Sequence, residues 1–251
     1  MQIGDSANKI RIVILAAGKG TRMKSELPKV LAPLRGQHMI RHLLESVDNS
    51  GIDPKPIVVV GHEKELVMKE LGNKYEYVVQ EELLGTGHAV ACAQVACKDT
   101  ENIIVISGDQ PFIKTETIKN LLSKHLNSKA KLTITTAELP DFQDWRAAFI
   151  KYGRILRDGE KIIDREFKDA TDKEKEITEV NVSLYAFNAK WLWENYKKIN
   201  AHTNSQKEYY LTDLWQIASQ NGDKIESFQI DPAEALGANS KEELEILENF
   251  T

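Results

Sequence analysis

Apolar residues in the first half of the chain follow two alternating patterns. Short continuous apolar runs predict buried strands, whereas apolar residues spaced three and four apart predict helices. The strands predicted in this way are 10–15, 57–60, 75–79, 102–106 and 132–136. The helices predicted between and after them are 38–49, 63–71, 87–98 and 115–126, the last capped by Thr115.

Apolar strands separated by helices predict an α/β fold, a Rossmann-like, mostly parallel sheet with helices on both faces. Right-handed crossovers then place the loops that follow the strands at one edge of the sheet, where ligands of such sheets bind. Three loops at this edge carry candidate chemistry: 16–29, 80–87 and 107–111.

The second half of the chain has a mixed pattern. Residues 154–163 predict a hairpin that turns at Asp158 and Gly159, and residues 180–187 predict a strand. Helices are predicted from Asn188 to Ile199, from Thr212 or Asp213 to about Gly222, and after Ser240, which forms a capping box with Glu243. We therefore expect one domain over residues 1–251, with a first lobe at about 9–137, a mixed α+β lobe at about 138–239 and a C-terminal helix at 240–251.

The composition is that of a globular protein, because 41% of the 251 residues are apolar and 28% are charged. The net charge of -5 argues against binding nucleic acid through bulk positive charge. Residues 1–9 lack the apolar core of a signal peptide, and no apolar run reaches transmembrane length. We expect a cytoplasmic protein with no membrane partner. Cys92 and Cys97 indicate neither a disulfide framework nor a metal cluster.

The first loop combines glycines with basic side chains. Gly18 and Gly20 come directly after a predicted strand, and Arg22 and Lys29 follow them. Glycine lets a backbone approach a ligand closely, and exposed N–H groups with nearby cations favour an anion. The spacing fits neither the P-loop nor the dinucleotide fingerprint, which requires glycine or alanine where Met23 stands.

The wider stretch around this loop is more specific. Leu-Ala-Ala-Gly-Lys-Gly-Thr-Arg-Met at 15–23, followed by Leu-Pro-Lys-Val-Leu at 27–31, resembles the signature of nucleotidyltransferases that make nucleoside-diphosphate sugars. Residues 80–89 resemble the uracil-binding loop of bacterial N-acetylglucosamine-1-phosphate uridylyltransferases. Gln80 can both donate and accept hydrogen bonds at a base edge, whereas a helix start capped by Thr86 is the alternative interpretation. His88 is expected to be structural.

The third loop reads Ser-Gly-Asp-Gln-Pro at 107–111. An aspartate directly after a buried strand is well placed to hold Mg²⁺, which prefers one or two carboxylates together with water and substrate phosphates. A turn aspartate before a proline is the alternative. The resemblance assigns Asp109 to the metal.

Five segments of the second half match the same family in order, and they lie at 152–155, 166–170, 179–181, 208–213 and 237–239. The sugar-side residues that the resemblance implies are Gly153, Glu166, Asn181, Tyr210 and Thr212. It also implies that Asn239 is the second protein ligand of Mg²⁺. Carboxylate and amide groups suit a sugar, because its hydroxyls donate and accept hydrogen bonds.

Three departures from the family pattern bear on the choice of sugar and base. Asn-Val-Ser at 181–183 stands where the family has Asn-Thr-Gly, and Lys-Tyr-Gly at 151–153 stands where it has Gly-Tyr-Gly. Leu83 occupies a position that is often a second glutamine. The bifunctional members continue into a left-handed β-helix, and the 251 residues contain no hexapeptide repeats. We expect no acetyltransferase activity, and a monomer or small homo-oligomer without the β-helix-driven trimer.

The resemblance implies transfer of UMP from UTP to N-acetylglucosamine 1-phosphate, with release of pyrophosphate and with Mg²⁺ as cofactor. The attacking phosphate is already an anion, so positioning and charge neutralisation must supply catalysis. Arg22 is expected to neutralise the leaving group, Lys29 to bind phosphate oxygens, and Asp109 to hold the metal. The substrate-binding residues expected in addition are Leu15, Ala16, Ala17, Gly18, Gly20, Thr21, Gln80, Gly85, Thr86, Gly108, Gly153, Glu166, Asn181, Tyr210, Thr212 and Asn239.

Two alternatives stay open at the level of sequence. One is a nucleotidyltransferase for another sugar 1-phosphate or nucleotide, because residues 108–111 also resemble cytidylyltransferases that act on the molybdenum cofactor. The other is a sugar-nucleotide-binding protein without turnover, which the joint presence of Arg22, Lys29, Asp109 and Asn239 disfavours.

Overall fold

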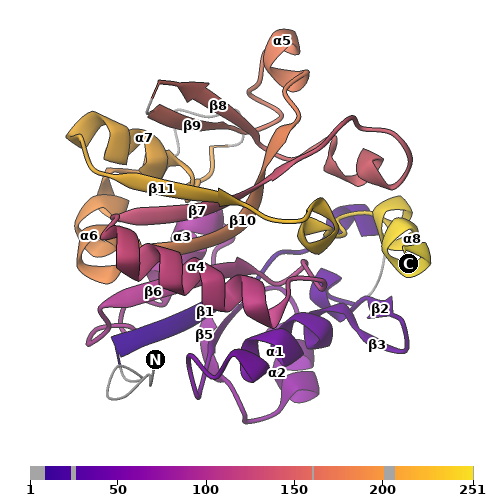
Figure 1. Ribbon diagram of the computed structural model, residues 1–251. Coiled ribbons are helices and arrows are strands. Elements are labelled where there is room, and N and C mark those ends of the chain that lie inside the picture. Colours follow the sequence, from indigo (N-terminus) through magenta and orange to yellow (C-terminus); the bar gives the residue numbers. More distant parts are fainter. Residues whose placement is uncertain (1–8, 24–26, 160, 201–206, 251) are drawn as a thin grey trace.

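Strand β1 (Ile10–Ala16) lies at the centre of the sheet, paired in parallel with β4 on one side and β6 on the other. The computed structural model of the protein describes residues 9–23, 27–159, 161–200 and 207–250. Within these residues the main sheet has nine strands, with the central order β11-β7-β10-β6-β1-β4-β5 (Figure 1). The other strands of this order are β4 (Ile57–Val60), β5 (Glu76–Val79), β6 (Asn102–Ser107), β7 (Leu132–Glu138), β10 (Glu179–Asn188) and β11 (Ile225–Gln229).

The direction of the strands confirms the predicted fold class. β6, β1, β4 and β5 pair in parallel, as do β7 and β11, whereas β10 is antiparallel to both β6 and β7. All five predicted strands of the first half are present to within two residues at each end. β11 was not predicted, because its sequence Ile-Glu-Ser-Phe-Gln carries only two apolar residues in a short stretch.

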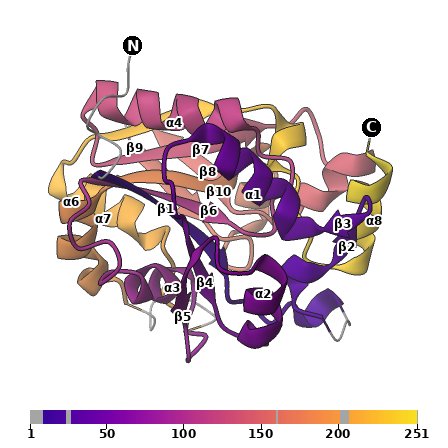
Figure 2. The same ribbon diagram turned by 90° about the horizontal axis from the view of Figure 1, so that it is seen from below.

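Helices cover both faces of this sheet. Along β1, Ile12 and Ile14 pack into one apolar core and Val13 packs into the other, as the alternation of a strand requires. Helices α1, α2, α4 and α8 contribute to the first core, and α3, α6 and α7 contribute to the second. Figure 2 shows α1 and α4 side by side on one face of the strands. The helices are α1 (Met39–Ser50), α2 (Lys64–Leu71), α3 (Thr86–Cys92), α4 (Thr115–Ser128), α5 (Asp172–Lys175), α6 (Ala189–Asn195), α7 (Asp213–Asn221) and α8 (Lys241–Asn249).

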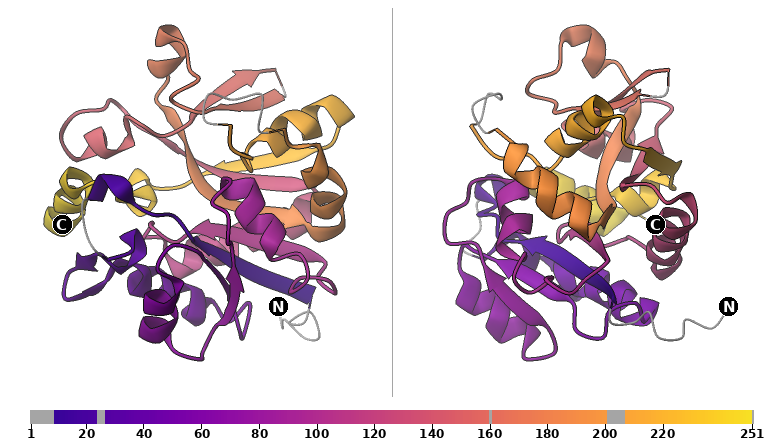
Figure 3. Two further views of the ribbon diagram at one scale, coloured as in Figure 1. Left: turned by 180° about the vertical axis from the view of Figure 1, so that it is seen from behind. Right: turned by 90° about the vertical axis from the view of Figure 1, so that its left-hand side faces the viewer.

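Shorter elements fill the connections between these. Strands β2 (Pro33–Leu34) and β3 (Gln37–His38) form a small separate pair. The predicted hairpin is confirmed as β8 (Arg154–Asp158) and β9 (Lys161–Arg165), with Gly159 at a φ of +60° in the turn. Figures 1 and 3 place this hairpin and α5 at one end of the sheet, and α7 packs against β9. Five 3₁₀ helices complete the described part: η2 (Thr21–Met23), η3 (Lys29–Leu31), η4 (Asp144–Phe149), η5 (Tyr196–Lys198) and η7 (Pro232–Ala235).

Several predictions of helix ends are wrong, each because a tertiary contact decides the local structure. Thr115 does not cap α4, because its hydroxyl donates to the backbone oxygen of Ser46 at 3.0 Å. Gly85, not Thr86, occupies the cap position of α3. α3 also ends at Cys92, six residues before the predicted end at Lys98, and a tighter i→i−3 bond at Ala93 follows it. The predicted caps Asn188, Thr212 and Ser240 do occupy cap positions.

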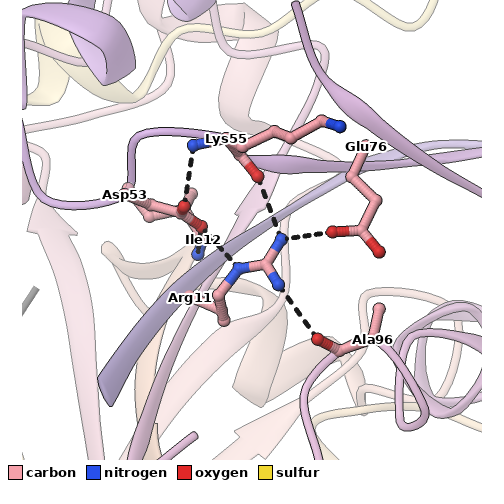
Figure 4. A network of polar contacts seen from close by, with 6 residues as sticks. All are labelled: Arg11, Ile12, Asp53, Lys55, Glu76 and Ala96. Carbon is pink, nitrogen blue, oxygen red and sulfur yellow. Dashed lines mark hydrogen bonds and ion pairs between the residues drawn. The ribbon is translucent and has the colours of Figure 1, made fainter. Parts of the chain in front are cut away.

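A charged network fixes the start of β1 (Figure 4). The Arg11 guanidinium donates to Asp53 Oδ2 at 3.0 Å, to Glu76 Oε2 at 2.8 Å and to two backbone carbonyls. Asp53 also accepts from the N–H groups of Ile12 and Lys55. Only 2% of the Asp53 side chain is accessible, so its charge depends on this cation. No helix in the described ranges is long and apolar enough to cross a membrane.

We expect Arg11→Met to lower the free energy of unfolding by about 3–5 kcal/mol, because it leaves Asp53 buried without its partner. Lys9→Met is the matched control. Lys9 pairs with Glu101 nearby, but both side chains are more than half exposed, so we expect a loss of about 1 kcal/mol or less. Urea unfolding of both variants measures the difference, and equal losses would contradict a special role for the Arg11 network.

Candidate active site

The loops that follow β1, β5 and β6 enclose a cavity of about 510 Å³ at the edge of the sheet. Nine of the predicted residues line it: Leu15, Ala16, Ala17, Gly18, Gly20, Lys29, Gln80, Gly85 and Thr86. Lys19, one of the basic side chains of the first loop, also lines this cavity, as do Ser107 and Glu208, which were not among the predicted site residues. The edge of the sheet that topology predicted is therefore where a concave site lies.

Position 20 requires glycine because the backbone there lies very close to the side chain of Lys29. Gly20 has a φ of +59°, and a Cβ added there would lie 2.5 Å from the Cβ of Lys29. A Cβ on Gly18, by contrast, would meet nothing within 4 Å. Gly20 thus lets the loop lie against the Lys29 stem, whereas Gly18 leaves open space toward the cavity.

The Lys29 ammonium joins two other predicted residues. It pairs with Asp109 Oδ2 and donates to Asn239 Oδ1 at 2.9 Å. Asp109 follows β6, and Asn239 directly precedes Ser240, the cap of α8, so three distant segments meet at one cation. The side chains of Lys29 and Asp109 are only 17% and 11% accessible.

The charge of Asp109 is stabilised by its surroundings. Burial alone would raise the pKa of this carboxyl, but the Lys29 charge, its hydrogen bond and a second bond from the Ser107 hydroxyl outweigh burial, and the pKa is lowered. The Ser107 Oγ donates to Asp109 Oδ1 at 2.7 Å. Asp109 is therefore an anion with one oxygen on Ser107 and the other on Lys29.

The same oxygens form a donor set that fits Mg²⁺. Asp109 Oδ2 and Asn239 Oδ1 already converge on a single cation, the Lys29 ammonium. Mg²⁺ is commonly held by one or two protein oxygens together with water and substrate phosphates. Among the described residues no group of three or more His, Cys, Asp or Glu side chains could hold a metal. A metal at this position would need to displace Lys29 from both oxygens.

The Gln80 amide has a fixed orientation in the second loop. Gln80 is buried, and its Nε2 donates to the Gly85 carbonyl at 3.1 Å and lies 3.0 Å from His88 Nδ1. A carbonyl can only accept, so the NH₂ group must face Gly85. The remaining acceptor of the side chain is Oε1. His88 thus has the structural role predicted for it, as a partner of Gln80.

A second cavity of about 420 Å³ contains the sugar-side residues Glu166, Tyr210 and Thr212. Asp164 and Asp213 line it as well. Burial, together with the charges of neighbouring carboxylates, raises the pKa of Glu166 to about 7 and that of Asp213 to about 6. One short segment borders both cavities, because Glu208 lines the first and Tyr210 lines the second.

The remaining predicted residues border these cavities or lie apart from them. Asn181 donates to Asp164 Oδ1 at 3.1 Å, and a Cβ on Gly153 would lie 2.5 Å from the same oxygen. Gly108 packs against the Leu15 carbonyl, so it serves the close approach of β6 to β1. Arg22 is exposed in η2, beside Thr21, and lines neither cavity. A larger cavity of about 570 Å³, between η4 and α8, contains no predicted residue.

The fold and the edge site define the class of the protein as a mostly parallel α/β protein with a ligand-sized cavity at the edge of its sheet. A structure described as a glucose-1-phosphate thymidylyltransferase from Bacillus anthracis in complex with a sucrose aligns with a TM-score of 0.72 and 18% identity, over 95% of this chain and 94% of that chain. 4-Diphosphocytidyl-2C-methyl-D-erythritol synthase from Anaerococcus prevotii aligns with a TM-score of 0.66 and 16% identity, over 97% and 98%. At these identities the likeness concerns the fold.

Sequence comparison gives the family. Residues 12–150, more than half of the chain, match the family described as "MobA-like NTP transferase domain", and the chain belongs to this family. It is also 43% identical over 239 residues to the bifunctional protein GlmU of Desulfitobacterium hafniense and 44% identical over 233 residues to that of Streptococcus mutans. These alignments cover 94% and 91% of this chain, which spans about half the length of these curated relatives, 51% and 49%. The resemblance found in the motifs is confirmed.

We expect Gly20→Ala to lower the free energy of unfolding by about 1–3 kcal/mol, because alanine is strained at this φ and its Cβ collides with Lys29. Gly18→Ala is the matched control within the same loop, and we expect a change within about 0.5 kcal/mol of the original protein. Chemical denaturation compares the two variants. A loss at Gly18 as large as that at Gly20 would show that the contact with Lys29 does not matter.

Proposed function

We propose that this chain transfers UMP from UTP to N-acetylglucosamine 1-phosphate, giving UDP-N-acetylglucosamine and pyrophosphate. The observation that carries the proposal is that one short segment borders two cavities, since Glu208 lines the loop cavity and Tyr210 and Thr212 line the carboxylate-rich cavity. Such an arrangement suits two substrates that must react with each other. The similarity to GlmU proteins over nearly the whole chain supports the same assignment.

The orientation of Gln80 supports uracil as the base. Both hydrogens of its amide group face Gly85 and His88, which leaves the carbonyl oxygen to meet a base. Uracil presents an N–H donor in the middle of its pairing edge, whereas cytosine presents an acceptor there. A carbonyl acceptor therefore favours UTP over CTP.

Positioning and charge are the catalytic contributions of the side chains. The attacking sugar phosphate is an anion, so no general base is needed, and the barrier is the approach of one anion to another. Lys29 is proposed to bind oxygens of the reacting phosphates, because its ammonium borders the loop cavity. Arg22, exposed on η2, is proposed to neutralise the departing pyrophosphate.

We further propose that Asp109 and Asn239 hold Mg²⁺ as the cofactor. When bound, the ion would neutralise phosphate charge between the two substrates. Lys29 would then leave the two oxygens and turn its ammonium toward the phosphates. A cytoplasmic location is also proposed, because UTP is an intracellular substrate and both cysteines are free.

An assay of pyrophosphate release tests the function, with UTP, dTTP, CTP and ATP each combined with several sugar 1-phosphates. We expect UTP with N-acetylglucosamine 1-phosphate to give the highest kcat/KM. Lys29→Ala should lower turnover about 10²–10³-fold, because a preorganised cation is lost. Lys98→Ala, which removes an exposed lysine that lines neither cavity, is the control. A higher kcat/KM with another pair of substrates would contradict the proposed substrates. Unchanged turnover in Lys29→Ala would contradict the proposed catalytic role of Lys29.

Binding of Mn²⁺, measured by electron paramagnetic resonance without substrates, tests the metal site. Asp109→Asn should weaken binding at least about tenfold, because it removes the charged ligand. Lys29→Met should strengthen binding about tenfold, because the metal no longer competes with an ammonium that makes charge-assisted bonds to both ligands. Weaker or unchanged binding in Lys29→Met would contradict the shared use of these oxygens.

A further inference from the structure

Asp164 connects three residues of the sugar-side cavity, although no motif singled it out. It lies on β9, which ends at Arg165, one residue before Glu166. It lines the 420 Å³ cavity together with Glu166 and Thr212. Its Oδ1 accepts from Asn181 and lies where a side chain at Gly153 would have to be. The site thus gathers around this carboxylate.

The orientation of Asn181 shows why this contact matters. Its Oδ1 accepts from the N–H of Ser183 at 2.9 Å and from the hydroxyl of Tyr185 at 2.7 Å. The NH₂ group must therefore point the other way, and one of its hydrogens goes to Asp164. With the carbonyl held by Ser183 and Tyr185, the other hydrogen is left for a ligand.

The backbone of β10 aims Asn181 at this place. The pairing of β10 with β7 shifts in register between Asn181 and Tyr185, which is the signature of a bulge. Ser183 within the bulge has a φ of +60°, a conformation that favours glycine. A strained conformation that persists beside a cavity is typical of a site whose geometry is under constraint.

Gly153 provides the space that Asp164 occupies. A Cβ at Gly153 would lie 2.5 Å from Oδ1 and 3.3 Å from Oδ2 of Asp164, so any larger residue would push the carboxylate away. Oδ2 is buried without a hydrogen-bond partner of good geometry, although the Thr212 hydroxyl is close enough to lower the pKa of this carboxyl. Asp164 is thus enclosed by predicted sugar-side residues from β10, from the start of β8 and from the cap of α7.

We infer that Asp164 is a positioning residue for the sugar phosphate, acting through Asn181, and that the cavity it completes selects a ligand rich in hydrogen-bond donors. This inference rests on the proposed function, because it assigns a new residue to the sugar side of that reaction. It does not extend to the nucleotide side, since Asp164 lines only the second cavity.

The ligand class follows from the unpaired groups of the cavity wall. Glu166 and Asp213 line this cavity, and Asp213 Oδ2 is buried without a hydrogen-bond partner. These groups are acceptors when ionised, and Asn181 offers one donor. A sugar with several free hydroxyls can donate to these carboxylates, and it can also accept from Arg165 in the same wall, whose Nε is buried without a hydrogen-bond partner.

The ionisation of Asp164 gives a separate means of testing its role. Burial raises the pKa of this carboxyl well above its usual range, and the charge of Glu166 adds to the rise. A group whose pKa is raised on folding stabilises the fold below its unfolded pKa and loses that contribution as the pH rises. At pH 7 the carboxyl is therefore unfavourable for stability.

The experiment compares Asp164→Ala and Asp164→Asn with Asp158→Asn, an exposed carboxylate on the same hairpin that serves as the matched control. For each variant, KM for the sugar 1-phosphate, KM for the nucleoside triphosphate, kcat and Tm are measured. Asp164→Ala should raise KM for the sugar phosphate about 10–100-fold, because it leaves the Asn181 amide without its acceptor, and change KM for the nucleotide less than about twofold. Asp164→Asn keeps an acceptor for Asn181 and should be intermediate.

Stability should move in the opposite direction. Asp164→Asn removes a buried carboxyl with a raised pKa, so its Tm at pH 7 should be equal to that of the original protein or higher by a few degrees. Gly153→Ala gives a second route to the same result, because its Cβ displaces Asp164. It should raise the sugar-phosphate KM alone.

Each outcome of the experiment decides between the hypotheses. If the original protein releases pyrophosphate with no sugar 1-phosphate, the proposed function fails and the role of Asp164 fails with it. If the protein is active but Asp164→Ala leaves the sugar-phosphate KM unchanged, or raises both KM values equally, only the role of Asp164 is refuted. A lower Tm in Asp164→Asn with proportionate losses of activity would identify a structural residue instead.

Discussion

The contact of Lys29 with Asp109 and Asn239 is the constraint on which the candidate site depends. Its two acceptors lie 80 and 210 residues farther along the chain, so the first loop, the end of β6 and the start of α8 must all be in place for it to form. Two glycines make this approach possible. Gly20 lies against the Lys29 stem, and a Cβ on Gly237 would lie 2.9 Å from the backbone oxygen of Asp109. Much of the chain is thereby tied to one buried ion pair.

A second set of contacts joins the two cavities. The N–H of Gly87 donates to the Tyr209 carbonyl at 2.7 Å, and the N–H of Tyr209 donates to the Leu84 carbonyl at 2.8 Å. Thr86 accepts from the N–H of Leu211 at 3.0 Å. Side chains at Gly85 and Gly87 would collide with Tyr209. A shift of the base loop must therefore move the segment that lines the sugar-side cavity, so the two subsites are mechanically coupled.

Sequence predicted the parts of the molecule that depend on local pattern. Continuous apolar runs predicted the five strands of the first half, and Asp158-Gly159 predicted the hairpin. Both predictions depend only on residues that are neighbours in the sequence. The roles that depend on distant partners were not predictable. Thr115 and Thr86 were candidates for helix caps. The Thr115 hydroxyl instead donates to the backbone oxygen of Ser46, and the Thr86 hydroxyl accepts from the N–H of Leu211. Asp164 carried no signal in the sequence, and its partner Asn181 lies in another strand. The sequence predicted that the loops lie at one edge of the sheet. It did not predict that Lys29 contacts the same oxygens that were expected to bind a metal.

The buried carboxyls of the sugar-side cavity lower the stability of the fold near neutral pH. Its carboxyls have raised pKa values, to about 7 for Glu166 and about 6 for Asp213, because burial and mutual repulsion disfavour their charges. Such groups stabilise the fold only where they are protonated, so their contribution is lost as the pH rises toward neutrality. A ligand that donates hydrogen bonds to them relieves this cost, and the relief appears as binding free energy. The cavity thus gains selectivity for donors from the same burial that raises these pKa values, and Arg165 in its wall supplies one positive charge against the carboxyls of Asp164, Glu166, Asp169 and Asp213.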